Sequence, residues 1–210
     1  FGTYPLDAAR TSLGERTLHA ASQPWDACRF VVDNGVRGRM WTFFGGGGFW
    51  AGCQPGEPAT GAVAAKVYID GRGGEAYDGA VYRTYTLIEA GGPAGLRAVL
   101  EGREPTVQEA ASIRPWVAGQ LAQAGITLAH VAIHNDETGI GAALFELPGW
   151  QVVYLDGRDA VLVDAGAPEG TELVARLDAG TVTFPSTLAQ RLTQAHRAQR
   201  QRRPGWARRA

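Results

Sequence analysis

Apolar residues recur along the chain with two different spacings. Short runs rich in β-branched and aromatic residues, closed by turn-forming residues, predict strands at 28–32 and 64–69. A third run at 127–133 directly follows a helical segment and predicts another strand. Two more runs, 150–155 and 160–163, are separated by a short turn sequence and predict a β-hairpin.

Helical spacing is clearest over 106–124. Thr106 occupies a capping position with Glu109 three residues later, apolar residues recur every fourth position, and Gly125 stands where helices commonly end. Pro115 lies inside this pattern and leaves open a division into two helices. Shorter helices are expected at 80–90, 95–100, 139–147 and 173–177.

The alternation of helices and strands predicts an α/β fold. We expect a single three-layer-like domain with a mixed sheet, a late β-hairpin and a basic helical C-terminal tail. The chain divides into a connecting segment at 1–24, an α/β domain at 25–185 and the tail at 186–210, with a short extended piece at 181–184. A length of 210 residues suffices for one hydrophobic core without metals or disulfides.

The formal net charge is −1, so an electrostatic partner would have to meet a local patch. Arg197, Arg200, Arg202 and Arg203 supply one and are candidates for contact with a protein subunit or a membrane surface, although a solvated helix is the simpler interpretation. Nucleic acid is not an expected partner, because Trp206 is the one aromatic residue near these arginines. No apolar run of about 18 residues and no signal-peptide pattern is found.

The chain has two cysteines, Cys28 and Cys53. Two are too few for a disulfide framework, and they lack the paired spacing of a zinc site. Two buried thiols are therefore the simpler expectation. A disulfide between them is the alternative in an oxidising compartment.

Two glycine-containing segments are candidates for ligand binding. The run Gly45–Gly48 lacks the Lys and Ser/Thr of a phosphate-binding loop, so we interpret it as backbone packed closely beneath aromatic residues. Asp70, Gly71 and Arg72 end a predicted strand, which is where open α/β sheets place ligand-binding groups. A tight turn, with Arg72 paired to a nearby carboxylate, is the alternative.

Histidines provide little support for a metal site. His130 and His134 are four residues apart, but they lie along a predicted strand, where this spacing does not bring a metal-binding pair together. No nucleophile motif or catalytic carboxylate pair is recognisable. The sequence therefore predicts no metal, no cofactor and no catalytic residue in this chain.

Several segments occur in an order that resembles a known family. These are Phe30–Asn34, the glycine and aromatic block ending at Trp50, Lys66–Arg72, Leu147–Trp150 and the predicted hairpin. Together they resemble the soluble C-terminal domain of polytopic glycosyltransferases of the dolichyl-phosphate-mannose mannosyltransferase (GT-C) type. The similarity covers about residues 28 to 163, with four glycines where two are usual and Phe49 where Tyr is common.

The resemblance implies that the catalytic carboxylate lies in a membrane portion outside this sequence. The chain would then be a non-catalytic, extracytoplasmic and membrane-associated domain that recognises the acceptor or organises the complex. Its expected partners are the membrane portion of the same or a neighbouring polypeptide and other protein subunits. Asn34, Asp70, Gly71 and Arg72 are the candidate ligand-binding residues.

Two other functions remain open at this point. The chain could be a stand-alone interaction subunit of a larger membrane-associated assembly, with its basic tail and exposed aromatic residues as docking surfaces. It could also be a soluble α/β enzyme that uses Asp70 and Arg72 at a strand end.

Overall fold

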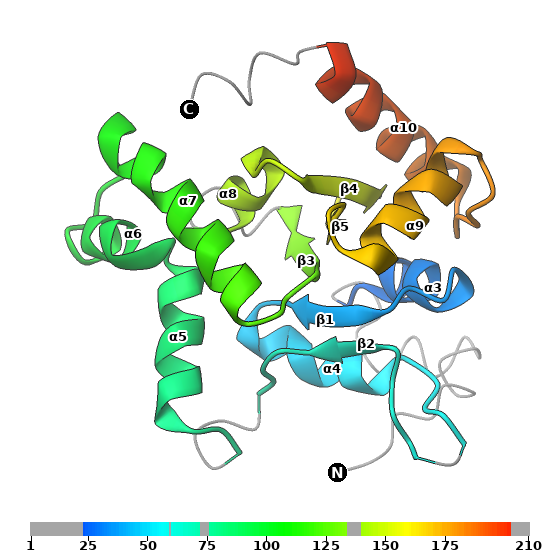
Figure 1. The fold of residues 1–210 in the computed structure, drawn as a ribbon, viewed down its shortest axis with the longest axis horizontal. Helices are drawn as coiled ribbons and strands as arrows, with labels where there is room; N and C mark the ends of the chain where they lie inside the picture. Colours follow the sequence, from blue (N-terminus) through cyan, green and yellow to red (C-terminus); the bar gives the residue numbers. More distant parts are fainter. Residues whose placement is uncertain (1–22, 59, 72–75, 134–139, 203–210) are drawn as a thin grey trace.

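A five-stranded mixed sheet forms the centre of the computed structural model, which describes residues 23–58, 60–71, 76–133 and 140–202 (Figure 1). The strand order is β2-β1-β3-β5-β4; β2, β1 and β3 are parallel, and β5 is antiparallel to both of its neighbours. The strands are β1 (Gly38–Trp41), β2 (Ala65–Val67), β3 (Leu128–Ala132), β4 (Trp150–Leu155) and β5 (Asp159–Asp164). The predicted mixed sheet and late hairpin are confirmed.

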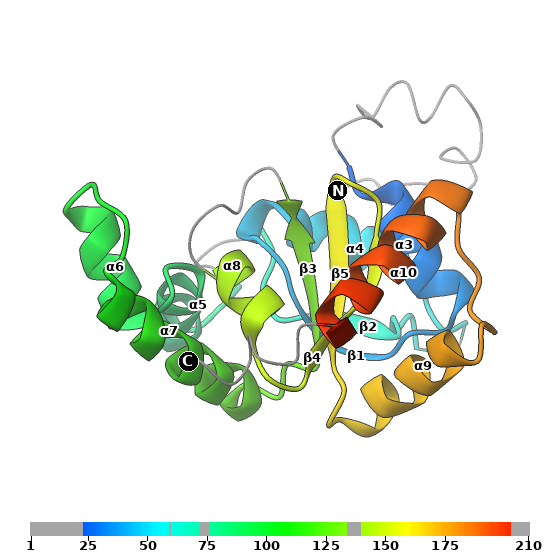
Figure 2. The same cartoon turned by 90° about the horizontal axis from the view of Figure 1, so that it is seen from above.

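Helices cover both faces of the sheet, which gives the expected helix–sheet–helix layering (Figure 2). One face carries α5 (Gly79–Glu89), α7 (Val107–Gln123) and α8 (Ile140–Glu146), with α6 (Gly92–Leu100) packed against α5 and α7. The other face carries α3 (Trp25–Asp33), α4 (Gly47–Gly52) and α9 (Pro168–Asp178). The short η2 (Phe44–Gly46) precedes α4, and its Phe44 packs against the cluster of the first face. The last helix, α10 (Thr187–Arg202), packs along β4.

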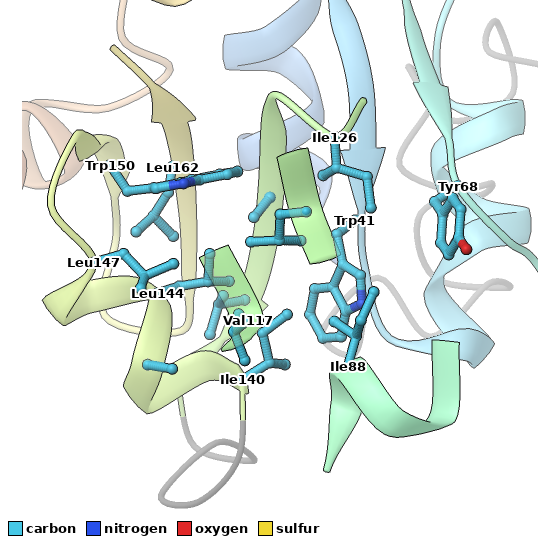
Figure 3. Close-up of a cluster of buried hydrophobic side chains, with 14 of the residues drawn as sticks. Trp41, Tyr68, Ile88, Val117, Ile126, Ile140, Leu144, Leu147, Trp150 and Leu162 are labelled. Atoms are coloured by element: carbon cyan, nitrogen blue, oxygen red, sulfur yellow. The ribbon is translucent and has the colours of Figure 1, made fainter. Parts of the chain in front are cut away.

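Each face has its own hydrophobic cluster. Trp41, Ile88, Val117, Leu144 and Leu162 belong to the first, where side chains of the sheet meet those of α5, α7 and α8 (Figure 3). The second cluster lies under α3, α4 and α9 and contains residues such as Phe30, Met40, Trp50, Val153 and Leu173. Because both faces are covered, the central strands are apolar on both sides.

The strand predicted at 28–32 is wrong, since these residues lie in α3. The buried residues of this segment are Ala27, Cys28, Phe30 and Val31, which is the spacing of one helical face. Arg29 is exposed on the opposite side and lies 3.4 Å from Asp26, one turn earlier. Burial of a helical stripe therefore outweighs the local β-propensity of the run.

Most of the other predicted elements are confirmed. Strands β2 and β3 lie within the predicted ranges 64–69 and 127–133, and helices form at each predicted site from α5 to α10. Residues 181–184 are not part of a strand, and β1 was not anticipated as one. Pro115 does not divide α7; both it and Ala111 are exposed, so solvent can satisfy the carbonyl that the missing amide leaves without a helical partner.

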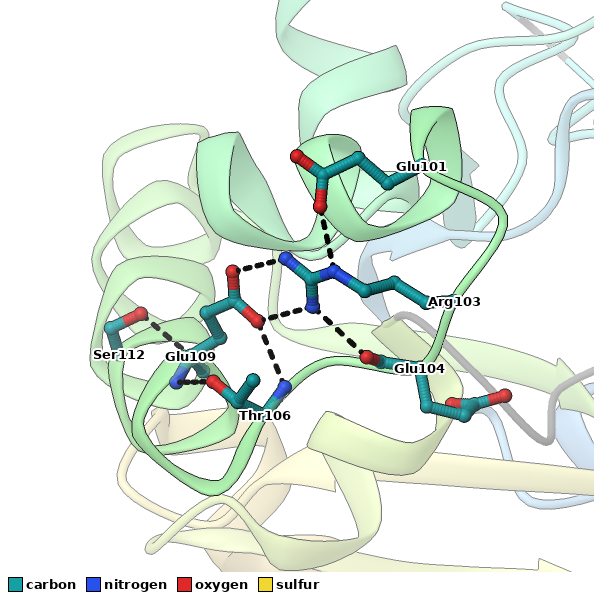
Figure 4. Close-up of polar contacts among 6 residues, drawn as sticks. All are labelled: Glu101, Arg103, Glu104, Thr106, Glu109 and Ser112. Atoms are coloured by element: carbon teal, nitrogen blue, oxygen red, sulfur yellow. Dashed lines mark hydrogen bonds and ion pairs between the residues drawn. The ribbon is translucent and has the colours of Figure 1, made fainter.

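The connection between α6 and α7 is held by an ionic network (Figure 4). Thr106 and Glu109 form the predicted capping box, and Arg103 binds Glu109 at 2.7 Å and Glu101 at 2.6 Å. The hydrogen bond from Arg103, followed by the backbone bond at Thr106, lowers the pKa of Glu109 to about 2. Helix capping and the ion pair with Arg103 explain the low pKa of Glu109, so this pKa does not indicate a functional site.

Candidate functional site

The chain leaves two adjacent parallel strands toward opposite faces of the sheet. After β1 it enters η2 and α4, whose Trp50 lies in the second cluster, and the helix after β3 is α8, whose Leu144 lies in the first. A pair of strands with this arrangement is a topological switch point, and open α/β sheets bind ligands at the carboxyl ends of such strands. The carboxyl ends of β1, β2 and β3 are therefore the candidate functional site.

A buried polar array lies at the base of this site. The Thr42 hydroxyl is 3.1 Å from His130 Nδ1, and His130 Nε2 is 2.9 Å from Asp159 Oδ1. Because a carboxylate only accepts, Nε2 carries the proton in neutral His130, and Thr42 donates to Nδ1. The array links the residue after β1, the middle of β3 and the first residue of β5.

The composition of this array is that of a hydroxyl, an imidazole base and an orienting carboxylate. The burial of the array argues against nucleophilic catalysis, because Thr42 and His130 are each only 1% exposed and Asp159 is 6% exposed. The Trp50 ring covers His130 at a centroid distance of 5.1 Å. A satisfied buried network of this kind instead fixes the ends of the strands that it joins.

Sequence reasoning missed this array. It considered His130 as a metal ligand together with His134, which lies outside the described residues. In the described part of the chain, no group of three His, Cys, Asp or Glu side chains could hold a metal ion. The sequence contained one indication of the array: His130 is the polar residue in the otherwise apolar run 128–132. Because buried polar groups are hydrogen-bonded, a histidine in a buried strand predicts a polar partner nearby.

Asp70 and Gly71 follow β2 and lie at the same end of the sheet. Asp70 is buried, and its amide donates to the Tyr77 hydroxyl at 3.1 Å. Gly47 packs directly on this backbone, so that a Cβ on Gly47 would lie 2.6 Å from the Asp70 Cα. The close approach expected for the glycine run is thus found at Gly47, whereas Arg72 lies outside the described residues.

Aromatic side chains border the site. Phe43 and Tyr82 are 40% and 43% exposed. The Phe44 ring packs edge-on against Tyr82 at 5.8 Å and against Tyr85 at 6.1 Å. Partly exposed aromatic residues near a few polar groups are typical of ligand-binding clefts.

Asn34, in contrast, has a structural role at the other end of the sheet. It precedes β1, and its amide nitrogen donates to the carbonyls of Phe30 and Thr183, both at 2.8 Å. Its carbonyl oxygen accepts from the Thr183 amide at 2.8 Å. These bonds tie the segment after α9 to α3 and occupy the Asn34 amide group, while a role of Asn34 in ligand binding stays a prediction.

The two cysteines form a disulfide. Cys28 of α3 is joined to Cys53, which follows α4, and both are buried. The simpler expectation of two thiols is wrong, and the alternative is what the structure contains. The bond holds α3 and α4 together on the same face of the sheet.

Two arginines of the basic tail contact their own domain. Arg197 donates to Asp178 at 2.9 Å and to Gln151 at 3.3 Å, and Arg200 donates to the Trp150 carbonyl at 3.0 Å. These two side chains are therefore engaged with their own domain at the sheet edge, while contact of α10 with a partner or membrane stays a prediction. The side chains of Arg202 and Arg203 lie outside the described residues.

In comparisons of the chain with protein-family models, curated proteins and solved structures, none matched. Among the helices of the described ranges, none combines the length and the apolar character needed to cross a membrane.

Proposed function

We propose that this chain is a non-catalytic recognition domain of a membrane glycosyltransferase-like protein, with its ligand contacts at the carboxyl ends of β1 and β2. The observation that supports this proposal is the packing of Gly47 on Asp70. Both residues belong to segments that carry the resemblance to GT-C enzymes, and they meet where the chain leaves the carboxyl ends of β1 and β2. Partly exposed Phe43 and Tyr82 then provide surface on which an acceptor can pack.

Two further features favour this function. Thr42, the hydroxyl of the polar array, is too buried to meet a substrate, which favours catalysis elsewhere in the complete polypeptide. The Cys28–Cys53 disulfide favours an oxidising environment, as expected for an extracytoplasmic domain next to a membrane.

The test uses the complete polypeptide in its native membrane, with a polyprenyl-phosphate-linked sugar as donor. Phe43→Ala and Tyr82→Ala should each raise KM for the acceptor about 3- to 10-fold with kcat unchanged, because each removes one aromatic contact. Leu188→Ala is the matched control, since Leu188 is an exposed apolar residue on α10. Sugar transfer by residues 23–202 alone, or an unchanged KM in both variants, would refute the proposal.

A second candidate function is an interaction subunit of a membrane-associated assembly. Val99 and Leu100 end α6, Val107 begins α7, and all three are exposed beside the Arg103 network. Clustered exposed apolar residues are typical of protein interfaces. On this alternative, the native protein co-purifies with a stoichiometric partner, and Leu100→Ser releases that partner while leaving acceptor KM unchanged.

A further inference from the structure

Helix α10 covers an edge of the sheet. Strand β4 is outermost in the strand order, so one side of its backbone has no neighbouring strand. The Leu155 amide donates to Thr193 Oγ1 at 2.9 Å, and the Trp150 carbonyl accepts from Arg200 at 3.0 Å. Side chains of α10 thus take the place of a sixth strand at both ends of β4.

The residues that contact this edge form one stripe on α10. Thr193, His196, Arg197 and Arg200 are spaced by three, four and seven residues, which places them on one helical face. Thr193 is fully buried and also donates to the Ala189 carbonyl at 2.8 Å. His196 lies in the middle of the stripe that holds α10 against the edge of β4.

His196 is poorly suited to carry a charge there. Its ring is half-buried and packs edge-on against Phe145 of α8 at 5.8 Å, and its Nε2 is buried with no hydrogen-bond partner among the described residues. Burial, and then the charge of Arg200, lower the pKa of His196. The docked helix therefore favours the neutral ring.

The other groups near this ring do not offset a positive charge. On α10 the charged neighbours are Arg200, which is itself a cation, and Arg197, which is paired with Asp178 of α9 at 2.9 Å. Glu146 of α8 is next to Phe145 in sequence but is held by Arg114 at 3.1 Å. The β4 residues bound by the stripe at this end are Trp150 and Gln151, neither of which titrates.

We propose that α10 is a pH-responsive cover of the β4 edge, docked while His196 is neutral and released when His196 is protonated. The proposal is independent of the proposed function. Because the pKa of His196 is lower in the docked than in the free helix, docking is fully favoured above about pH 6.5 and weakens as pH falls below it. Release would free the Leu155 amide and the Trp150 carbonyl for pairing with a further strand.

Amide hydrogen exchange of the full chain between pH 5 and 8 tests this proposal. The protection factor of the Leu155 amide, corrected for the intrinsic pH dependence of exchange, should fall by up to about tenfold per pH unit below about pH 6.5. The variant His196→Gln should remove this dependence. The Leu128 amide of β3, an interior strand, is the internal reference and should keep its protection.

Two outcomes would overturn the proposal. One is a protection factor at Leu155 that does not vary with pH in the native chain. The other is the same pH dependence in His196→Gln, which would assign it to another group. If His196→Gln does not fold, the imidazole titration of His196 in the native chain decides: its midpoint must coincide with the loss of protection at Leu155, and a separation of more than about one pH unit refutes the mechanism.

Discussion

Removal of the Cys28–Cys53 disulfide should lower the stability of the domain by a predictable amount. The bond closes a loop with a sequence separation of 25 residues. The loop-entropy relation gives about 3.5 kcal/mol for a loop of this length at 25 °C, through restriction of the unfolded chain. Both cysteines are buried, so replacing them also changes core packing.

Urea unfolding separates these two effects. The native chain in its oxidised form is compared with the same chain reduced by a phosphine, which breaks the cross-link and keeps both sulfur atoms. With a slope of about 2 kcal/mol per M, the unfolding midpoint should fall by about 1.7 M on reduction. The variant Cys28→Ala/Cys53→Ala should fall at least as far, because it adds a loss of buried volume.

Two results would refute this reasoning. Two free thiols per chain in denatured, unreduced protein from its native source would show that the disulfide does not form there. A midpoint that moves by less than about 0.5 M on full reduction would show that the cross-link contributes far less than its loop length implies. The second result would also weaken the use of this bond as support for an extracytoplasmic location.

Three further predictions follow from the described contacts. Gly47→Ala should destabilise the domain by at least about 2 kcal/mol in urea unfolding, because its Cβ would overlap the backbone after β2, whereas Gly48→Ala, with open space around it, should change stability by less than about 1 kcal/mol. Gln54→Ala should lower the free energy of unfolding by about 1–3 kcal/mol in the same assay. The Gln54 side chain accepts from the Ala65 amide at 2.9 Å and donates to the Ala65 carbonyl at 2.8 Å, on the side of β2 that has no neighbouring strand. Equal stability of the variant and the native chain would refute this role. The stability difference between the native chain and Glu109→Gln should be constant above about pH 4.5 and decline as pH falls toward 2, because the pKa of Glu109 is depressed in the folded state; a difference that does not change with pH would contradict it.

Local patterns were sufficient for the elements whose signals lie within a few residues. The capping box of Thr106 and Glu109 predicted the start of α7, and the turn between two β-branched runs predicted the β4–β5 hairpin. These interactions join neighbours in sequence, so the sequence states them directly. The α/β class followed from the order of such elements.

Local patterns gave wrong predictions where burial against the sheet determined the conformation of a segment. Residues 28–32 have the composition of a strand, but one helical face of α3 covers the sheet and the segment is helical. Asn34 was a candidate for ligand binding through the family resemblance, whereas the structure shows that its amide binds Thr183, which is 149 residues away in sequence. No local pattern reports a partner at that separation.

What the sequence determined by itself is therefore the class of the fold, most of its helices, the hairpin and the presence of Asp70 and Gly71 at a strand end. The tertiary structure decided the strand order, the switch point between β1 and β3, and the contact of Thr42 and Asp159 with His130. It also placed Arg200 where its side chain donates to the Trp150 carbonyl at the edge of β4. The reason is physical: helices and turns form through neighbouring backbone and side-chain groups, whereas sheet order and buried polar partners depend on which surfaces the whole chain can bury at once.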